Sequence, residues 1–104
     1  MRKEFFQWLS GTDRIRTRFE AARGKVSMLV VQYEALVGDN WEPVVRYDTA
    51  HGYLHKDIYY PRGPEGGARK ERVTVADLNQ GLTEAIDDLE KHWENYKKRL
   101  HRRD

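Results

Sequence analysis

The stretch VSMLVVQYEALVGDNWEPVVRYDTAHGYLHKDIYY, residues 26–60, decides the fold. Its β-branched and aromatic runs, at 26–37, 41–50 and 53–60, are typical of β-strands. Gly38-Asp39-Asn40 and His51-Gly52 separate these runs and favour tight turns. The sequence therefore predicts a three-stranded antiparallel meander.

The expected register assigns each residue of the meander to one face, because side chains alternate along a strand. A two-residue turn at 51–52 sets Asp48 opposite His55 and Arg46 opposite Asp57, and a three-residue loop at 38–40 joins the first two strands. The face expected to pack against helices carries Leu29, Val31, Tyr33, Val45, Tyr47, Leu54 and Ile58. The opposite, polar face carries Gln32, Glu34, Arg46, Asp48, His55, Asp57 and Tyr59.

Residues 74–101 are expected to form a long amphipathic helix, because apolar residues recur there at steps of three and four. Thr74 or Asp77 is the expected N-cap. The buried stripe is expected to comprise Leu82, Ile86, Leu89 and Trp93.

The remaining segments complete a single α+β domain over residues 1–104. Residues 1–25 are expected to hold one or two short helices, at 3–9 and 12–22, broken by Ser10-Gly11. Residues 61–72 are rich in Pro, Gly and charge and predict a loop. The expected fold is thus a three-stranded antiparallel meander (26–60) packed on a long C-terminal helix (74–101), with a helical N-terminal segment.

The amino-acid composition and the distribution of charge limit the classes of function that the protein can have. The chain has no cysteine, which excludes disulfides, thiolate metal sites and a cysteine nucleophile, and fits the cytoplasm. The N-terminal apolar run is broken at Gln7 and is too short for a signal peptide or a membrane span, so no membrane association is expected. Both ends of the chain are basic and its middle is acidic, which suits phosphate contacts or, for the last helix, the helix dipole.

The polar face concentrates groups suited to metal-independent RNA cleavage. An imidazole beside a carboxylate can act as a general acid or base, and an adjacent guanidinium can grip a phosphate. The expected catalytic residues are His55, His51, Asp48 and Arg46. The expected nucleic-acid contacts are Tyr53, Tyr59, Arg69, Lys70, Lys97 and Lys98. Alternatively, the cross-strand Asp–His and Arg–Asp pairs satisfy one another on a solvated sheet face.

Metal binding is a weaker interpretation. Asp48, His51 and His55 offer oxygen and nitrogen ligands, but their spacing suits a helix better than a hairpin. No metal and no cofactor is therefore expected. The segment GPEGGARK lacks the spacing of a phosphate-binding loop, and no nucleophile elbow is present.

The segment VVRYDTAHGYLHKDIYYPRG, residues 44–63, resembles a group of small uncharacterised prokaryotic proteins. They share a core of the form V-x-R-Y-D-x-A-H-G-x-x-H-x-D, followed by a basic loop and an amphipathic helix. More distantly, the pattern resembles the TumE-type toxins of toxin–antitoxin pairs. That resemblance implies action on RNA and points to Arg46, Asp48, His51 and His55.

We therefore expect a cytoplasmic, RNA-directed toxin, a metal-independent ribonuclease whose partners are RNA and a protein antitoxin. The alternative is a non-catalytic module that uses an exposed strand edge or helix to join a protein or nucleic-acid assembly.

Overall fold

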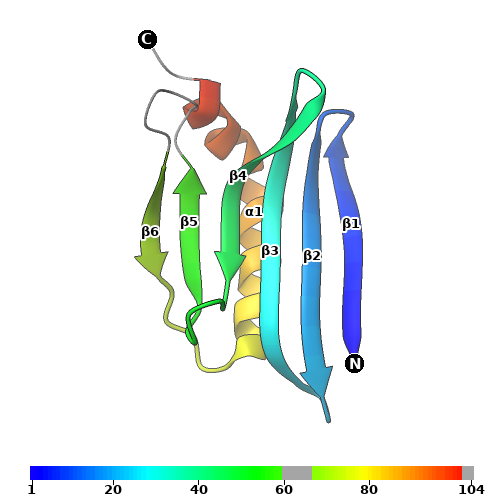
Figure 1. Cartoon of the computed structure of the whole chain (residues 1–104), viewed down its shortest axis with the longest axis vertical. Coiled ribbons are helices and arrows are strands. Elements are labelled where there is room, and N and C mark those ends of the chain that lie inside the picture. The colour runs from blue at the N-terminus through cyan, green and yellow to red at the C-terminus, as the bar shows by residue number, and fades with distance from the viewer. Residues whose placement is uncertain (60–66, 102–104) are drawn as a thin grey trace.

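The computed structural model describes residues 1–59 and 67–101, without the side chains of Leu100 and His101. Six strands form one antiparallel sheet in chain order, and one helix follows them (Figure 1). The elements are β1 (Arg2–Ser10), β2 (Asp13–Ala22), β3 (Lys25–Val37), β4 (Asn40–Asp48), β5 (His55–Tyr59), β6 (Ala68–Arg72) and α1 (Leu78–His101).

The helix covers one face of the sheet and leaves the other open. α1 packs mainly against β3 and β4, and in Figure 1 it lies behind the sheet. The core between the two layers includes Ile15, Leu29, Val31, Tyr33, Val45, Tyr47, Leu54, Ile58, Ala85 and Leu89, all of them buried. All seven residues expected on the packed face of the meander are in this list, so that assignment is confirmed.

The turn between β3 and β4 differs from the expected one. Val37 pairs with Asn40, so the turn has two residues, 38–39, and the three-residue loop expected at 38–40 is wrong. Two-residue turns match the twist of an antiparallel hairpin better than most longer loops.

A β-bulge restores the expected register beyond this turn. Glu34 pairs with Pro43 while Tyr33 pairs with Val45, which makes Val44 an extra residue on β4. The extra residue compensates for the shorter turn. The polar and apolar faces therefore match the sequence-based assignment.

The pairing of β4 with β5 follows the prediction. Asp48 pairs with His55, and Arg46 pairs with Asp57. The expected two-residue turn at 51–52 is wrong, however, because residues 49–54 all lie between the two strands. This longer connection keeps the register, since it is centred on the same two residues.

The N-terminal helices are wrong: β1 and β2 form a hairpin that extends the sheet beyond β3. The first half of β2 alternates, with Asp13, Ile15 and Thr17 buried and with Arg14 and Arg16 half-buried on the opposite face. Arg23 and Gly24 make the turn into β3, both at positive φ (54° and 77°), a conformation that favours glycine. The predicted three-stranded meander with N-terminal helices is therefore wrong, because the sheet has six strands and its open face is wider than expected.

The loop expected at 61–72 is wrong at its end, because Ala68–Arg72 forms the edge strand β6. Its residues are almost all charged, a composition that protects a sheet edge against pairing with other chains. Residues 61–66 of the expected loop lie outside the described residues.

The C-terminal helix is confirmed, although it begins at Leu78 and not at 74. Asp77 is its N-cap, since its Oδ1 accepts the backbone N–H of Gln80 at 2.9 Å. Of the expected stripe, Leu89 is fully buried, whereas Leu82, Ile86 and Trp93 are half-buried against the core. No helix among residues 1–59 and 67–101 is long and apolar enough to span a bilayer.

Two carboxylates, the buried Asp13 and the half-buried Asp88, fasten α1 to the sheet. Asp88 of α1 accepts hydrogen bonds from the hydroxyls of Tyr47 (2.6 Å) and Tyr96 (2.8 Å). Asp13 of β2 accepts the hydroxyl of Tyr33 at 2.6 Å and the ammonium of Lys97 at 2.9 Å. Burial raises the pKa of each carboxyl group, but these hydrogen bonds outweigh it, so both pKa values lie below the usual range.

Candidate nucleic-acid interface

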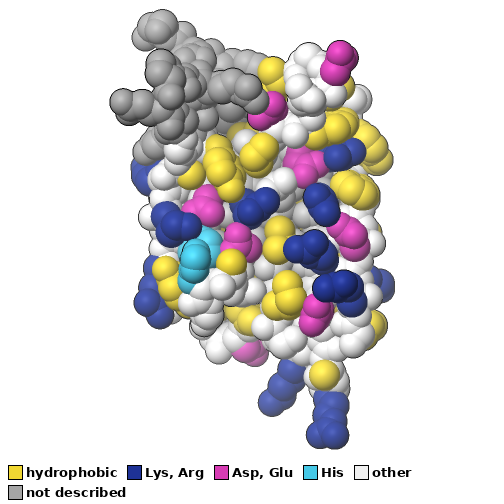
Figure 2. Space-filling model, in the orientation of Figure 1, with side chains coloured by type: hydrophobic (Ala, Val, Ile, Leu, Met, Phe, Trp, Pro, Cys, Tyr) yellow, Lys and Arg dark blue, Asp and Glu magenta, His cyan; other side chains and the backbone are white. Residues whose placement is uncertain are grey.

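The open face is the surface of the sheet opposite α1, and its side chains form three rows across the strands. The first row contains Glu4, Arg18, Val30, Asp48, His55 and Arg72. The second contains Phe6, Arg16, Gln32, Arg46, Asp57 and Lys70. The third contains Trp8, Arg14, Glu34 and Pro43. Figure 2 shows this face, with basic side chains spread over it between acidic and hydrophobic ones.

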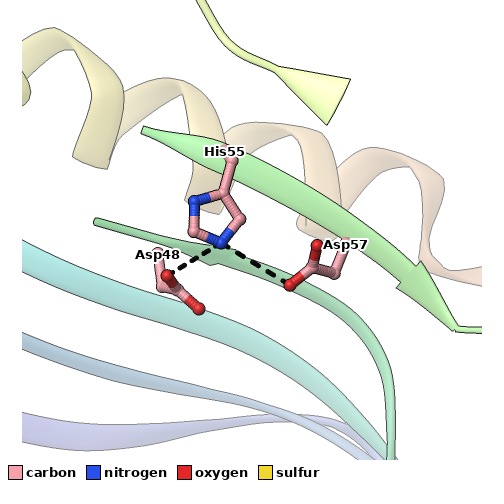
Figure 3. Close-up of side chains that lie close together, drawn as sticks. All are labelled: Asp48, His55 and Asp57. Carbon is pink, nitrogen blue, oxygen red and sulfur yellow. Dashed lines mark ion pairs between the residues drawn. The ribbon is translucent and has the colours of Figure 1, made fainter. Parts of the chain in front are cut away.

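A histidine lies between two carboxylates where β4 and β5 pair. Nε2 of His55 is 3.0 Å from Oδ1 of Asp48 and 3.6 Å from Oδ2 of Asp57 (Figure 3). All three side chains are buried, with His55 only 1% exposed. We call Asp48, His55 and Asp57, with the neighbouring His51 and Tyr53, the histidine corner.

The connection between β4 and β5 explains why the histidine is buried on a face that no helix covers. The ring centroids of His51 and Tyr53 lie 5.4 Å and 5.6 Å from that of His55. The connection is held by Asp48, whose Oδ1 accepts the N–H of Ala50 at 2.9 Å. Because His51 is exposed, it is the imidazole of the corner that a bound molecule can touch.

Two cations balance the carboxylates of the corner. Nζ of Lys70 lies 3.1 Å from Oδ1 of Asp57, and Nη1 of Arg46 lies 3.9 Å from Oδ2 of Asp48. The hydrogen bond with Asp57 raises the pKa of Lys70, so this ammonium stays charged. The corner thus presents positive groups beside its exposed imidazole.

A continuous polar chain links the corner to the far side of the face. Nε of Arg46 donates to Oε1 of Gln32 at 2.7 Å, and Nε2 of Gln32 donates to Oε2 of Glu34 at 2.6 Å. Nε of Arg14 donates to the other oxygen of Glu34 at 2.7 Å. These bonds hold both arginines in fixed orientations.

Three aromatic rings surround Arg14. Its guanidinium carbon lies 3.9 Å from the ring centroid of Trp41, 4.6 Å from that of Phe6 and 5.7 Å from that of Trp8. Trp8 and Trp41 also pack edge to face at 5.6 Å. Phe6 is 47% and Trp8 59% exposed, so this aromatic cluster offers ring surfaces to solvent.

Between the aromatic cluster and the corner, the sheet surface is hollowed. The hollow has a volume of about 180 Å³ and is lined by Arg16, Arg18, Val30, Gln32 and Arg46. We call it the arginine hollow.

Asp48, His55 and Asp57 are also the described residues best placed to hold a metal ion. Each offers one ligand atom, and these atoms lie within 4.8 Å of one another. This set replaces His51 of the sequence-based alternative with Asp57. A bound ion would displace the contact between Asp48 and His55 and compete with Lys70.

Most of the predicted site residues come together on the open face: Arg46, Asp48, His51, Tyr53, His55, Tyr59 and Lys70. Tyr59 is half-buried there, and burial raises its pKa. Arg69 lies elsewhere, because it pairs with Ile58 and shares the helix side of the sheet. Lys97 and Lys98 lie on α1, Lys97 bound to Asp13 and Lys98 exposed.

Sequence reasoning missed the half of the open face that β1 and β2 supply. Arg14, Arg16 and Arg18 alternate with Ile15 and Thr17, and this two-residue period was a usable strand signal. It also missed Arg72 of β6, whose guanidinium lies over the ring of Tyr53 at 4.5 Å.

Neither a curated protein nor a solved structure matches the chain. One family model does match, and it spans residues 1–104, which includes every strand, the helix and the whole open face. The chain therefore belongs to the family described as domain of unknown function DUF7718.

Proposed function

We propose that the protein binds single-stranded RNA on the open face and cleaves it at the histidine corner. The observation that carries the proposal is the exposure of Phe6 and Trp8 beside Arg14, on a sheet face that no described element covers. Aromatic rings stack unpaired bases of any sequence, and neighbouring guanidinium groups follow the backbone. Buried bases of a duplex cannot make these contacts.

The proposed chemistry is transesterification by the RNA's own 2′-hydroxyl. The 2′-oxygen attacks the adjacent phosphorus, the bond to the 5′-oxygen breaks, and a 2′,3′-cyclic phosphate forms. His51 accepts the proton of the 2′-hydroxyl, and the hydroxyl of Tyr53 donates a proton to the leaving 5′-oxygen. Lys70 stabilises the charge that develops on the phosphate oxygens, and Arg46, which lies between the corner and the arginine hollow, contacts a further phosphate of the strand.

The burial of His55 changes its proposed role. At 1% exposure it cannot contact a substrate, so we assign it a positioning role, holding His51 and Tyr53 by ring contact. Asp48 in turn fixes the ring of His55 through Nε2. The catalytic role expected for His55 thus passes to His51 in this proposal.

The biological setting we propose is a toxin–antitoxin pair in the cytoplasm. It rests on the resemblance of residues 44–57 to TumE-type toxins and on the absence of cysteine from the sequence. A protein antitoxin would have a natural docking edge in β1, which pairs on one side only and exposes Phe5, Phe6 and Trp8.

The same exposed edge favours a second candidate, a non-catalytic protein-interaction module. Binding of the purified protein to fluorescein-labelled single-stranded and duplex RNA of equal length decides between the two. We expect the single strand to bind at least tenfold more tightly and to yield products that end in a 2′,3′-cyclic phosphate. Failure to bind single-stranded RNA at low salt would leave the interaction module as the better candidate.

A further inference from the structure

The arginine hollow lies in the middle of the open face, across β2, β3 and β4. Arg16 and Arg18 approach it from β2, and Arg46 approaches it from β4. Val30 and Gln32 of β3 lie between them. Three guanidinium groups therefore converge on one depression, and none of the described residues that line it is a carboxylate.

One of these arginines has a hydrogen-bonding group that the protein does not use. Nε of Arg18 is buried and has no partner among the described residues. A buried donor without an acceptor is costly, and such a group in a folded protein calls for a ligand or a functional explanation. An anion in the hollow would supply the acceptor once the half-buried side chain of Arg18 turns toward it.

Of the other two arginines, one is held in place and one can turn toward a ligand. Nε of Arg46 is anchored on Gln32 at 2.7 Å, which leaves the outer nitrogens of its guanidinium to other partners. Nε of Arg16 donates to Glu4 at 2.9 Å, but both side chains are about 40% exposed, so solvent screens this pair. The hollow therefore combines one fixed arginine, one half-buried arginine with an unused donor and one adjustable arginine.

We propose that the arginine hollow binds a phosphate group. Guanidinium groups match phosphate oxygens in geometry and charge, and three of them can surround one tetrahedral anion. We take this phosphate to belong to the backbone of single-stranded RNA, and in this respect the inference rests on the proposed function. It adds a defined anchor on β2 that acts at a distance from the histidine corner.

The spacing of the strands gives the distance between the arginine hollow and the histidine corner. Val30, at the middle of the hollow, shares a row with Asp48 and His55, and two strand spacings separate Val30 from His55. At about 4.8 Å each, these spacings amount to about 10 Å, which is more than one nucleotide can span. A phosphate held in the hollow would therefore lie upstream or downstream of the cleaved bond and would fix the register of the strand.

The first test needs neither RNA nor a variant. Inorganic phosphate is titrated into the intact protein, and the Nε–H resonances of its arginines are followed by NMR. We expect the signals of Arg16, Arg18 and Arg46 to shift together and to saturate, while that of Arg99 on α1 barely moves. Shifts that are absent, or equal for all exposed arginines, would overturn the phosphate site.

The second test uses labelled single-stranded RNA with Arg18→Gln and the matched control Arg99→Gln. Arg18→Gln should weaken binding about tenfold and flatten the salt dependence by about one unit of slope, since one phosphate contact is lost. Arg18→Lys, which keeps the charge and loses the planar fork, should be intermediate. If Arg18→Gln and Arg99→Gln bound RNA with equal affinity, the phosphate in the hollow would not be that of the RNA backbone.

The two tests separate the site from the function. Saturable phosphate binding together with a failure to bind any RNA would retain the hollow and reject the proposed function. RNA binding without a phosphate response in the hollow would retain the function and reject the anchor.

Discussion

The carboxylate of Asp48 lies 3.0 Å from Nε2 of His55, and both residues are buried although they face the open side of the sheet. The pair joins the end of β4 to the start of β5. A solvent-exposed pair of this kind would contribute little to stability. In a buried pair, removal of one partner leaves the other buried without its counterpart, which is costly.

His55→Ala should therefore destabilise the fold by about 2–4 kcal/mol, because it leaves two buried carboxylates without their imidazole. Urea unfolding followed by tryptophan fluorescence measures the change. His51→Ala is the matched control, since this exposed imidazole should cost less than about 0.5 kcal/mol. Equal costs for the two variants would contradict the burial of His55.

His51→Ala should instead lower the rate of RNA cleavage by about 10²–10⁴-fold, the usual contribution of a general base, while leaving RNA affinity unchanged. Single-turnover cleavage of a labelled RNA gives the rate. His92→Ala, an exposed histidine on α1, should cleave at the wild-type rate.

Cleavage should also survive a chelator, since no step of the proposed reaction uses a metal ion. If EDTA abolishes cleavage and a divalent ion restores it, the three ligand atoms of Asp48, His55 and Asp57 would become the better candidate for the catalytic centre.

Variants of two adjacent phenylalanines of β1 can distinguish base stacking from nonspecific apolar contact with RNA. Phe6→Ala removes a ring from the open face and should weaken single-stranded RNA binding by about 1–3 kcal/mol. Phe5 faces the other side of the sheet, opposite Thr17, and Phe5→Ala should leave the affinity unchanged. Equal losses in the two variants, measured by fluorescence anisotropy, would argue against a stacking surface.

Acid should loosen the attachment of α1. The pKa values of Asp13 and Asp88 are lower in the folded protein than in the unfolded chain. Each carboxylate therefore contributes stability that is complete above about pH 5 and is lost as the pH falls through its folded pKa. The free energy of unfolding should decline below about pH 5.

The variant Asp88→Asn removes one of the two carboxylates and so measures its separate contribution. The variant should lose about 1–3 kcal/mol at pH 7, where Tyr47 and Tyr96 no longer donate to a charged group, and its stability should depend less on pH below 5. Urea titrations at pH 7 and pH 3 test both points. A variant whose acid sensitivity equals that of the wild type would assign the effect to other groups.

The sequence predicted the antiparallel pairing of β3, β4 and β5 and their two faces, because residues 26–60 carry strong strand signals, but the three-stranded sheet is wrong, since three further strands extend it. It failed at β1, whose side chains are exposed on both faces and show no alternation of apolar and polar residues. It failed at β6 because an edge strand of charged residues has the composition of a loop. At β2, the alternation was present, but Ile15, Phe19 and Ala22 also fit a short helical face.

The residue pairs of the candidate site could be predicted from the sequence, but the burial of those residues could not. The pairing of Asp48 with His55 follows from the register alone. The burial of His55 depends on how residues 49–54 fold back over it, and no local pattern encodes that. The bulge at Val44 is likewise invisible in the sequence, since its only effect is to compensate for a shorter turn.

The consecutive order of the six strands has a consequence for synthesis. Each strand pairs with the one made just before it, so the sheet can grow by short loop closures as the chain leaves the ribosome. The apolar face that carries Leu29, Val31 and Tyr33 is then complete before α1 exists to cover it. Chains that end before Leu78 would lack α1 and display this face, which makes them prone to aggregate or to be captured by chaperones.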